Sequence, residues 1–106
     1  MGFIDFLRGP DIHRGVEEQL AVSGSVLLDV RNEDEYRAGH IPGSRNLPLH
    51  TIDKVGSIAE NKDTPLYVYC YSGARSRQAT AVLQRMGYSN VKNIGGIAAW
   101  NGKVER

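Results

Sequence analysis

Short apolar runs alternate with amphipathic stretches along most of this chain, and the connections between them are short. The runs at 25–30 and 66–69 are rich in Val, Leu and Tyr, which is typical of buried β-strands. Residues 91–94 predict a further strand, and 45–49 predict a short one that ends at its proline. Strands that alternate with helices across short connections predict an α/β domain with a largely parallel central sheet flanked by helices.

The helices between these strands are predicted from apolar residues at helical spacing. In the clearest one, four apolar residues stand at positions i, i+3, i+4 and i+7, and Gly87 stops the helix: Ala79, Val82, Leu83 and Met86. A helix is also predicted between residues 14 and 23, with Val16, Leu20 and Ala21 as its apolar positions. Residues 51–60 predict another, and Asn32 is the predicted N-cap of a helix that ends by Gly39.

The chain has 106 residues, with 13 Lys and Arg against 12 Asp and Glu, and a single cysteine. This length fits one domain, which we expect at 11–106 after a short N-terminal extension at 1–10. A net charge of +1 with both signs interspersed predicts neither a nucleic-acid nor a membrane partner. One cysteine forms no internal disulfide or multi-cysteine zinc site, so no metal is expected. Without a signal peptide or an apolar run of ~20 residues, a cytoplasmic location is expected, and segment 1–7 is predicted to dock as an amphipathic turn.

The single cysteine, Cys70, stands where a predicted strand leads through a loop into the clearest helix. Ligands of open parallel α/β sheets bind beyond the carboxyl ends of the strands, which is the place of this loop. A loop that curls into a helix N-terminus directs backbone N–H groups inward and favours an anion. Gly73 permits a positive φ in such a curl, and the Arg75 guanidinium adds a charged planar donor. We therefore expect a pKa below ~8.5 for Cys70 and a nucleophilic thiolate that receives an anionic substrate.

Four short motifs follow one another between about residues 11 and 101. They are D-V-R from Asp29 with E-Y from Glu35, G-H-I-P-G-S from Gly39, C-Y-S-G-A-R-S from Cys70, and G-G from Gly95 with a later Trp. In order and spacing they match the D-V-R…E-[YF], G-H-I-x-G-[SA], C-x-x-G-x-R-S and G-G-x-x-x-W segments of one family. The chain resembles a single-domain rhodanese, a sulfurtransferase.

This resemblance implies a covalent transfer in two steps that needs no metal or organic cofactor. The Cys70 thiolate attacks the outer sulfur of a small anionic donor such as thiosulfate, and sulfite leaves. The persulfide on Cys70 then passes its sulfur to cyanide or to a thiol, and a protein persulfide is a further candidate donor or acceptor. The anion is expected to bind the loop residues that follow the cysteine: Tyr71, Ser72, Gly73, Ala74, Arg75 and Ser76.

Two charged residues after the first long strand are expected to support this site. Asp29 is predicted at the edge of the sheet where the loop lies, to hydrogen-bond loop or arginine groups or to cap a helix or turn. Arg31 is predicted either to add positive charge at the entrance or to pair with Glu33 or Glu35 at the surface. His40 is expected to have a structural role in its Gly-His-Ile-Pro-Gly turn.

Other functions are compatible with the same architecture. Phosphatases and arsenate reductases of the rhodanese-like fold wrap a tetrahedral oxyanion in a C-x5-R loop, whereas Ser76 occupies that arginine position and Arg75 gives C-x4-R. Asp29 is the one candidate for the general acid that such chemistry requires. A non-enzymatic sulfur-carrier or protein-binding module is the main alternative. Cys70 could also be a buried, unreactive residue, as lone cysteines commonly are.

Overall fold

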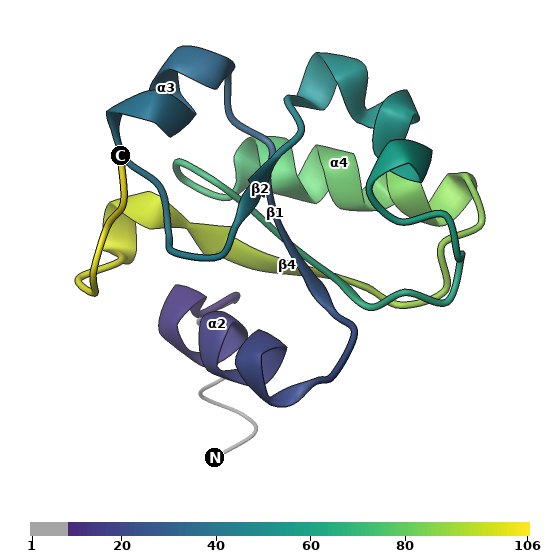
Figure 1. The fold of residues 1–106 in the computed structure, drawn as a ribbon, viewed down its shortest axis with the longest axis horizontal. Coiled ribbons are helices and arrows are strands. Elements are labelled where there is room, and N and C mark those ends of the chain that lie inside the picture. The colour runs from purple at the N-terminus through teal and green to yellow at the C-terminus, as the bar shows by residue number, and fades with distance from the viewer. Residues whose placement is uncertain (1–8) are drawn as a thin grey trace.

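The computed structural model describes residues 9–106, so the turn predicted for segment 1–7 lies outside the described residues. Figure 1 shows the path of the chain, with η denoting a 3-10 helix. In chain order the elements are α2 (Ile12–Ala21), β1 (Val26–Asp29), α3 (Glu33–Ala38), β2 (Arg45–Asn46), η1 (Leu49–Ser57), β3 (Leu66–Cys70), α4 (Ala74–Arg85), β4 (Val91–Gly96) and η2 (Ile97–Ala99).

The four strands form one sheet in the order β2-β1-β3-β4, and every pair of neighbours is parallel. The predicted α/β domain with a parallel sheet is therefore confirmed. In Figure 1, α2 lies on one side of the sheet, whereas α4 and η1 lie on the other. Because β1 and β3 are parallel, their carboxyl ends lie at the same end of the sheet, which is where open parallel sheets bind ligands.

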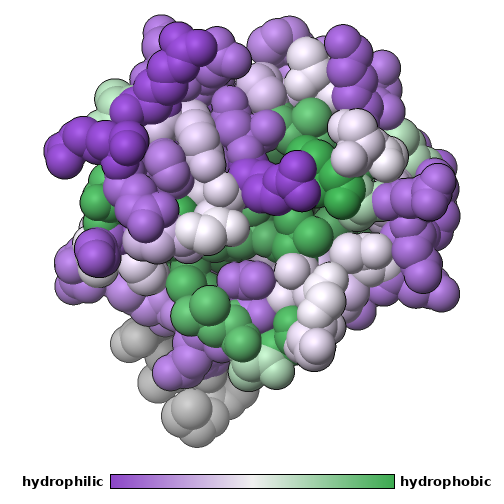
Figure 2. Space-filling view, in the orientation of Figure 1, coloured by the Kyte–Doolittle hydropathy of each residue, from purple (hydrophilic) through white to green (hydrophobic). Residues whose placement is uncertain are grey.

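Side chains alternate across β3, whose five residues are all buried, and this alternation divides the core in two. Leu66, Val68 and Cys70 pack on the α4 and η1 face, whereas Tyr67 and Tyr69 pack on the α2 face. Figure 2 shows hydrophilic side chains around the rim of the molecule in the view of Figure 1, and hydrophobic ones toward its middle. The strand period thus places the cysteine side chain under α4.

The segment between β2 and β3 differs from the prediction because of Pro48. The strand expected at 45–49 ends at Asn46, since proline has no N–H for the ladder. The helix expected at 51–60 is instead the 3-10 helix η1, which begins directly after Pro48 and ends at Ser57. Thr51 has a non-helical φ of −118° and interrupts η1 by a kink. The apolar face that was predicted for this segment nevertheless packs into the core.

The helix predicted between 14 and 23 begins two residues earlier, at Ile12, because Asp11 caps it. The carboxylate of Asp11 accepts hydrogen bonds at 3.0 and 3.3 Å from backbone N–H groups of the first turn. Leu20, which was predicted on the apolar face, is 76% exposed. The helix meets the core through Ile12, Gly15 and Val16 in its first half, whereas Leu20 in its last turn lies away from the core.

The chain end folds back on the turn after α3. His40 and Glu105 form an isolated antiparallel bridge, in which each backbone N–H donates to the other carbonyl oxygen at 2.9 Å. Figure 1 shows the C-terminus beside α3. None of the helices within residues 9–106 has the length and apolar character that crossing a bilayer requires.

Candidate active site

Cys70 is the last residue of β3, one position further along the strand than predicted, and it is completely buried. Residues 71–73 connect it to α4, and Gly73 is the N-cap of that helix with a φ of 102°. A side chain would strain this left-handed conformation, which glycine adopts readily. The sulfur therefore lies against the first turn of α4, where backbone N–H groups have no partner inside the helix.

The sulfur of Cys70 forms one hydrogen bond with the loop and one with the first turn of α4. The Gly73 N–H donates to Sγ at 3.0 Å, and the Ser76 Oγ lies 3.5 Å from it. Burial raises the pKa of Cys70, but the Ser76 hydroxyl and the backbone N–H groups of Ser76, Gly73 and Arg75 outweigh burial and lower the pKa overall. The site thus favours a thiolate, as an anion-binding loop would.

Arg75 has a carboxylate partner that the sequence did not indicate. Its guanidinium forms a two-pronged ion pair with Glu35 of α3, with Nη1–Oε1 at 2.7 Å and Nη2–Oε2 at 3.1 Å. The hydrogen bond from Arg75 lowers the pKa of Glu35 to about 2, against the opposing effect of burial. The largest contributions that favour a Cys70 thiolate come from Ser76 and from backbone N–H groups, and the charge of Arg75 also interacts with Cys70.

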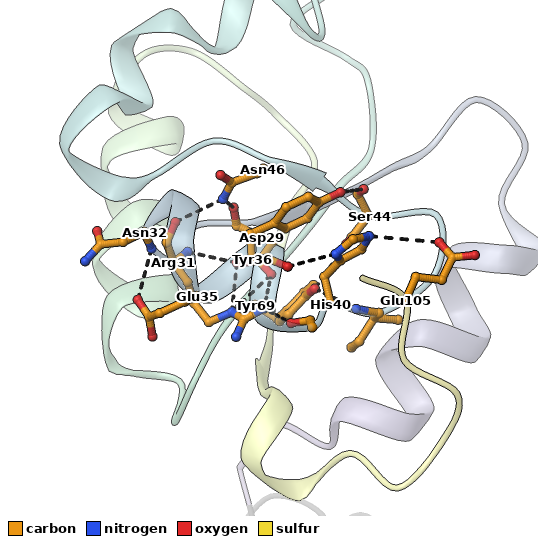
Figure 3. A network of polar contacts seen from close by, with 12 residues as sticks. Asp29, Arg31, Asn32, Glu35, Tyr36, His40, Ser44, Asn46, Tyr69 and Glu105 are labelled. Atoms are coloured by element: carbon orange, nitrogen blue, oxygen red, sulfur yellow. Dashed lines mark hydrogen bonds and ion pairs between the residues drawn. The ribbon is translucent and has the colours of Figure 1, made fainter.

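Asp29 and Arg31 form a buried ion pair with each other. Arg31 is 5% exposed, its Nη2 lies 2.7 Å from Asp29 Oδ2, and its Nε lies 3.1 Å from both carboxylate oxygens (Figure 3). The predictions of a positive charge at the entrance or of a surface pair with Glu33 or Glu35 are therefore wrong. The chain leaves the sheet after Asp29, so the arginine turns back onto the carboxylate, and its Nη2 also donates to the Gly39 carbonyl at 2.7 Å.

The Gly-His-Ile-Pro-Gly-Ser segment forms a scaffold around that ion pair (Figure 3). Tyr69 accepts a hydrogen bond from the Ile41 N–H at 3.1 Å and donates to Ser44 Oγ at 3.1 Å. Tyr36 donates to the Ser44 carbonyl at 2.6 Å, and its ring stacks on His40 with 3.8 Å between centroids. The imidazole of His40 thus contacts α3 and the chain end, not the cysteine loop, which fits the structural role expected of it.

The Gly-Gly pair at the end of β4 lets the cysteine loop close over the sheet. A Cβ at Gly96 would lie 2.0 Å from the Tyr71 carbonyl oxygen and 2.7 Å from Ser72 Cα, so no side chain fits. The Tyr71 carbonyl instead accepts a hydrogen bond from the Ala98 N–H at 3.0 Å. Gly95 has a φ of 104° and directly follows Ile94, the extra residue of the bulge where β4 slips by one residue against β3.

An open cavity of about 590 Å³ adjoins the loop above the buried sulfur. Its lining joins the predicted loop residues to the end of β4: Pro10, Tyr71, Ser72, Gly73, Ala74, Arg77, Asn93, Gly95, Gly96, Ala98 and Ala99. Tyr71 is 55% exposed there, and Ser72 and Ala74 are exposed beside it. Arg77 is also exposed, and its guanidinium has no hydrogen-bond or ion-pair partner among residues 9–106. Arg77 therefore places a positive charge at the edge of the cavity, and no described carboxylate pairs with it.

Sequence reasoning missed two residues of this site. Glu35 was predicted as part of a motif but not as the partner of Arg75, because the two are 40 positions apart. Asn93 was predicted only as a strand residue, yet its side chain reaches Ser76 and the loop. The available signal was an uncharged polar residue at a half-buried strand position two residues before Gly95. Within residues 9–106 no group of three or more His, Cys, Asp and Glu side chains gathers in a way that could hold a metal ion.

The model of the rhodanese-like domain family matches residues 13–103 of this chain. The chain belongs to the rhodanese-like family. It is 42% identical over 88 residues to a sulfurtransferase of Allochromatium vinosum, which covers 80% of each chain. It is 37% identical over 84 residues to the thiosulfate sulfurtransferase GlpE of Ectopseudomonas mendocina, which covers 78% of this chain and 76% of that one.

Other relatives of the rhodanese-like domain are only partly covered by it. The domain is 36% identical over 80 residues to the putative sulfur carrier protein YrkF of Bacillus subtilis, and spans 74% of this chain but 43% of that protein. Among solved structures, a rhodanese with anions from E. coli superposes with a TM-score of 0.72 at 30% identity, covering 77% of this chain and 98% of that one. The sequence resemblance to the rhodaneses is therefore confirmed.

Proposed function

We propose that this rhodanese-like domain is a sulfurtransferase that moves a sulfane sulfur from thiosulfate, or a similar anionic donor, to a thiol or to cyanide through a persulfide on Cys70. The observation that carries the proposal is the environment of Cys70 Sγ, which receives the Gly73 N–H at 3.0 Å and lies 3.5 Å from Ser76 Oγ. These groups stabilise negative charge on a sulfur atom wherever it develops during the reaction.

The first half-reaction exchanges one S–S bond for another. The Cys70 thiolate attacks the outer sulfur of thiosulfate, the bond between the two donor sulfurs breaks, and sulfite leaves with the electron pair. The product is a persulfide whose outer sulfur carries the negative charge. Arg77 lies at the edge of the cavity with no ion-pair partner among residues 9–106, and its field favours the approach of a dianionic donor.

The second half-reaction returns the thiolate. A thiolate acceptor attacks the outer sulfur of the persulfide, and Cys70 leaves as a thiolate stabilised by the same loop groups. Cys70 is the only cysteine of the 106-residue chain, so no second thiol within it can resolve the persulfide. The acceptor therefore lies outside these 106 residues, and a small thiol or a protein cysteine can take that role.

Access to Cys70 requires movement of the loop that covers it, because the residue is 0% exposed. The connection at 71–73 is the segment that separates the sulfur from the cavity. We propose that this connection shifts when the donor enters and returns over the persulfide. The free thiol is the form that a reducing cytoplasm maintains, and we propose this compartment for the protein.

The test is the intact mass of the protein after incubation with thiosulfate, before and after addition of a reductant. We expect a gain of one sulfur atom that the reductant reverses, and no gain in a Cys70→Ser variant. A folded wild-type protein with a reduced Cys70 that gains no sulfur would reject thiosulfate as the donor. A protein persulfide should then be offered as the donor in the same assay.

A sulfur-carrier role is the second candidate, and the complete burial of Cys70 favours it because a covered persulfide is shielded from small acceptors. A persulfide that survives excess cyanide and small thiols, but passes to one protein thiol, would assign the carrier role. Phosphatase or arsenate-reductase activity is disfavoured because Arg75 is bound by Glu35 instead of facing an oxyanion over the sulfur. Cys70-dependent hydrolysis of an aryl phosphate would overturn that judgement.

A further inference from the structure

The hydroxyl of Ser76 lies among more acceptors than its single proton can serve. Its Oγ is 2.7 Å from Asn93 Oδ1, 3.1 Å from the Gly73 carbonyl oxygen and 3.4 Å from the Gly95 carbonyl oxygen. The sulfur of Cys70 lies 3.5 Å from the same Oγ. Ser76 is completely buried, so these protein groups are its partners. The direction of one proton therefore decides what the sulfur receives from Ser76.

Asn93, half-buried on β4, is held in one orientation by the bulge and the loop. Its Oδ1 accepts a hydrogen bond from the Gly95 N–H at 3.0 Å, and its Nδ2 donates to the Gly73 carbonyl at 3.4 Å. If the amide were flipped, its NH2 group would face the Gly95 N–H, and two donors would oppose each other. The carboxamide oxygen consequently faces Ser76 and is the nearest acceptor of its proton.

We propose that Asn93 is a positioning residue that competes with the sulfur of Cys70 for the proton of Ser76. While Cys70 is a thiol, its S–H donates to Ser76 Oγ, and the Ser76 O–H donates to Asn93 Oδ1. When the S–H proton has passed to solvent, the Ser76 O–H turns to the thiolate, and Asn93 keeps the Gly95 N–H. Ser76 retains its own proton throughout, so the event is a reversal of hydrogen-bond direction.

This competition makes the resting site less favourable to a thiolate than the loop alone would be. Each time negative charge develops on Sγ, the Ser76 hydroxyl must leave its shortest partner, Asn93, and that exchange costs part of the gain. Its importance for sulfur transfer rests on the proposed function, in which Cys70 leaves as a thiolate in the second half-reaction. Its effect on the ionisation of Cys70 is independent of any substrate and can be measured alone.

The test is a double-mutant cycle on the pKa of Cys70, followed by the ultraviolet absorbance of the thiolate against pH, with Cys70→Ser as the blank. We expect Asn93→Ala to lower the pKa of Cys70 by about 0.5 to 1, because the sulfur then loses its nearest competitor for the Ser76 proton, and the Gly73 and Gly95 carbonyls that remain lie farther away. Ser76→Ala should raise this pKa. The double variant should have the pKa of Ser76→Ala alone, because Asn93 acts through Ser76.

Lys92→Ala is the matched control, since Lys92 is the exposed neighbour on β4 and pairs with Glu18 at 2.8 Å. Lys92→Ala should leave the pKa of Cys70 unchanged. The ion pair between Arg75 and Glu35 is present in every variant, so it does not contribute to the differences between them. An unchanged or raised pKa in folded Asn93→Ala, or an equal shift in the Ser76→Ala background, would overturn the proposal.

Circular dichroism verifies folding, and Asn93→Asp serves if the alanine variant does not fold. The aspartate keeps both acceptor contacts and should hold the Ser76 proton more firmly. It should therefore raise the pKa of Cys70 more in the presence of Ser76 than in the Ser76→Ala background, and equal shifts would refute the proposal. Loss of persulfide formation with thiosulfate would count against the proposed function alone, because the absorbance titration uses no sulfur donor.

Discussion

Gly96→Ala should damage the active-site loop without straining the substituted residue itself. Gly96 has an extended backbone, with φ −135° and ψ 145°, which any residue adopts. Its new Cβ would lie 2.0 Å from the Tyr71 carbonyl oxygen, whereas Cβ contacts under 3.0 Å essentially never occur, so the loop must recede by at least 1.0 Å. Overpacking of this kind costs about 1 to 3 kcal/mol, and the Ala98–Tyr71 hydrogen bond, worth about 1 kcal/mol, is lost as well.

We therefore expect a loss of about 2 to 4 kcal/mol in the free energy of unfolding by urea, together with a raised pKa of Cys70 as the loop N–H groups move from the sulfur. Gly56→Ala is the matched control, because a Cβ at Gly56 of η1 meets nothing within 4 Å. It should leave the pKa of Cys70 unchanged and cost no stability. A Gly96→Ala protein with the stability and the Cys70 pKa of the wild type would refute this reasoning.

Three further predictions concern the ion pairs. Glu35→Gln releases the Arg75 guanidinium and should lower the KM for thiosulfate in an assay with cyanide as the acceptor. Arg75→Ala should raise this KM. An unchanged KM in both variants would exclude Arg75 from donor binding. Because the folded pKa of Glu35 is about 2 against an ordinary 4.5, its contribution to stability is complete above pH 4.5 and is lost as the pH falls toward 2. The difference between the urea unfolding midpoints of the wild type and Glu35→Gln should accordingly become smaller as the pH falls from about 6 to about 3. A difference that stays constant over this range would contradict the expected pH dependence. Asp29→Asn leaves the Arg31 charge buried without a counter-charge and should cost about 3 kcal/mol in urea unfolding, while the exposed Asp34→Asn should cost nothing measurable; equal effects would remove the buried pair as the cause.

The strand–loop–helix around Cys70 could be predicted because its signals are local. An apolar run, a glycine and a helical apolar spacing lie within about 20 consecutive residues, and each agrees with the others. The direction of the cysteine pKa followed from the same local pattern, since backbone N–H groups accompany any helix N-terminus. Local agreement of this kind is what single-sequence reasoning handles best.

The partners of the charged side chains could not be predicted, because they depend on how distant segments meet. The Arg75–Glu35 pair joins α4, which follows β3, to α3, which follows β1. The two helices meet because β1 and β3 are neighbours in the sheet, and only the strand order shows this. Arg31 has surface glutamates close in sequence, and the bend of the chain after β1 turns it to Asp29 instead. The mid-strand position of Asn93 likewise indicates nothing until β4 is placed under the loop.

Reactive cysteines usually combine a lowered pKa with exposure to solvent, whereas Cys70 has a lowered pKa and is completely buried. A thiol with a lowered pKa that faces solvent is the kind that peroxide converts to sulfenic and then sulfinic acid, and the second product ends its chemistry. Under the closed loop, the same thiolate is electronically activated but out of contact with dissolved oxidants. On the proposed mechanism, loop opening limits both the reaction with substrates and the oxidation of Cys70. A variant that loosens the loop should therefore speed the inactivation of the protein by peroxide before it alters the fold.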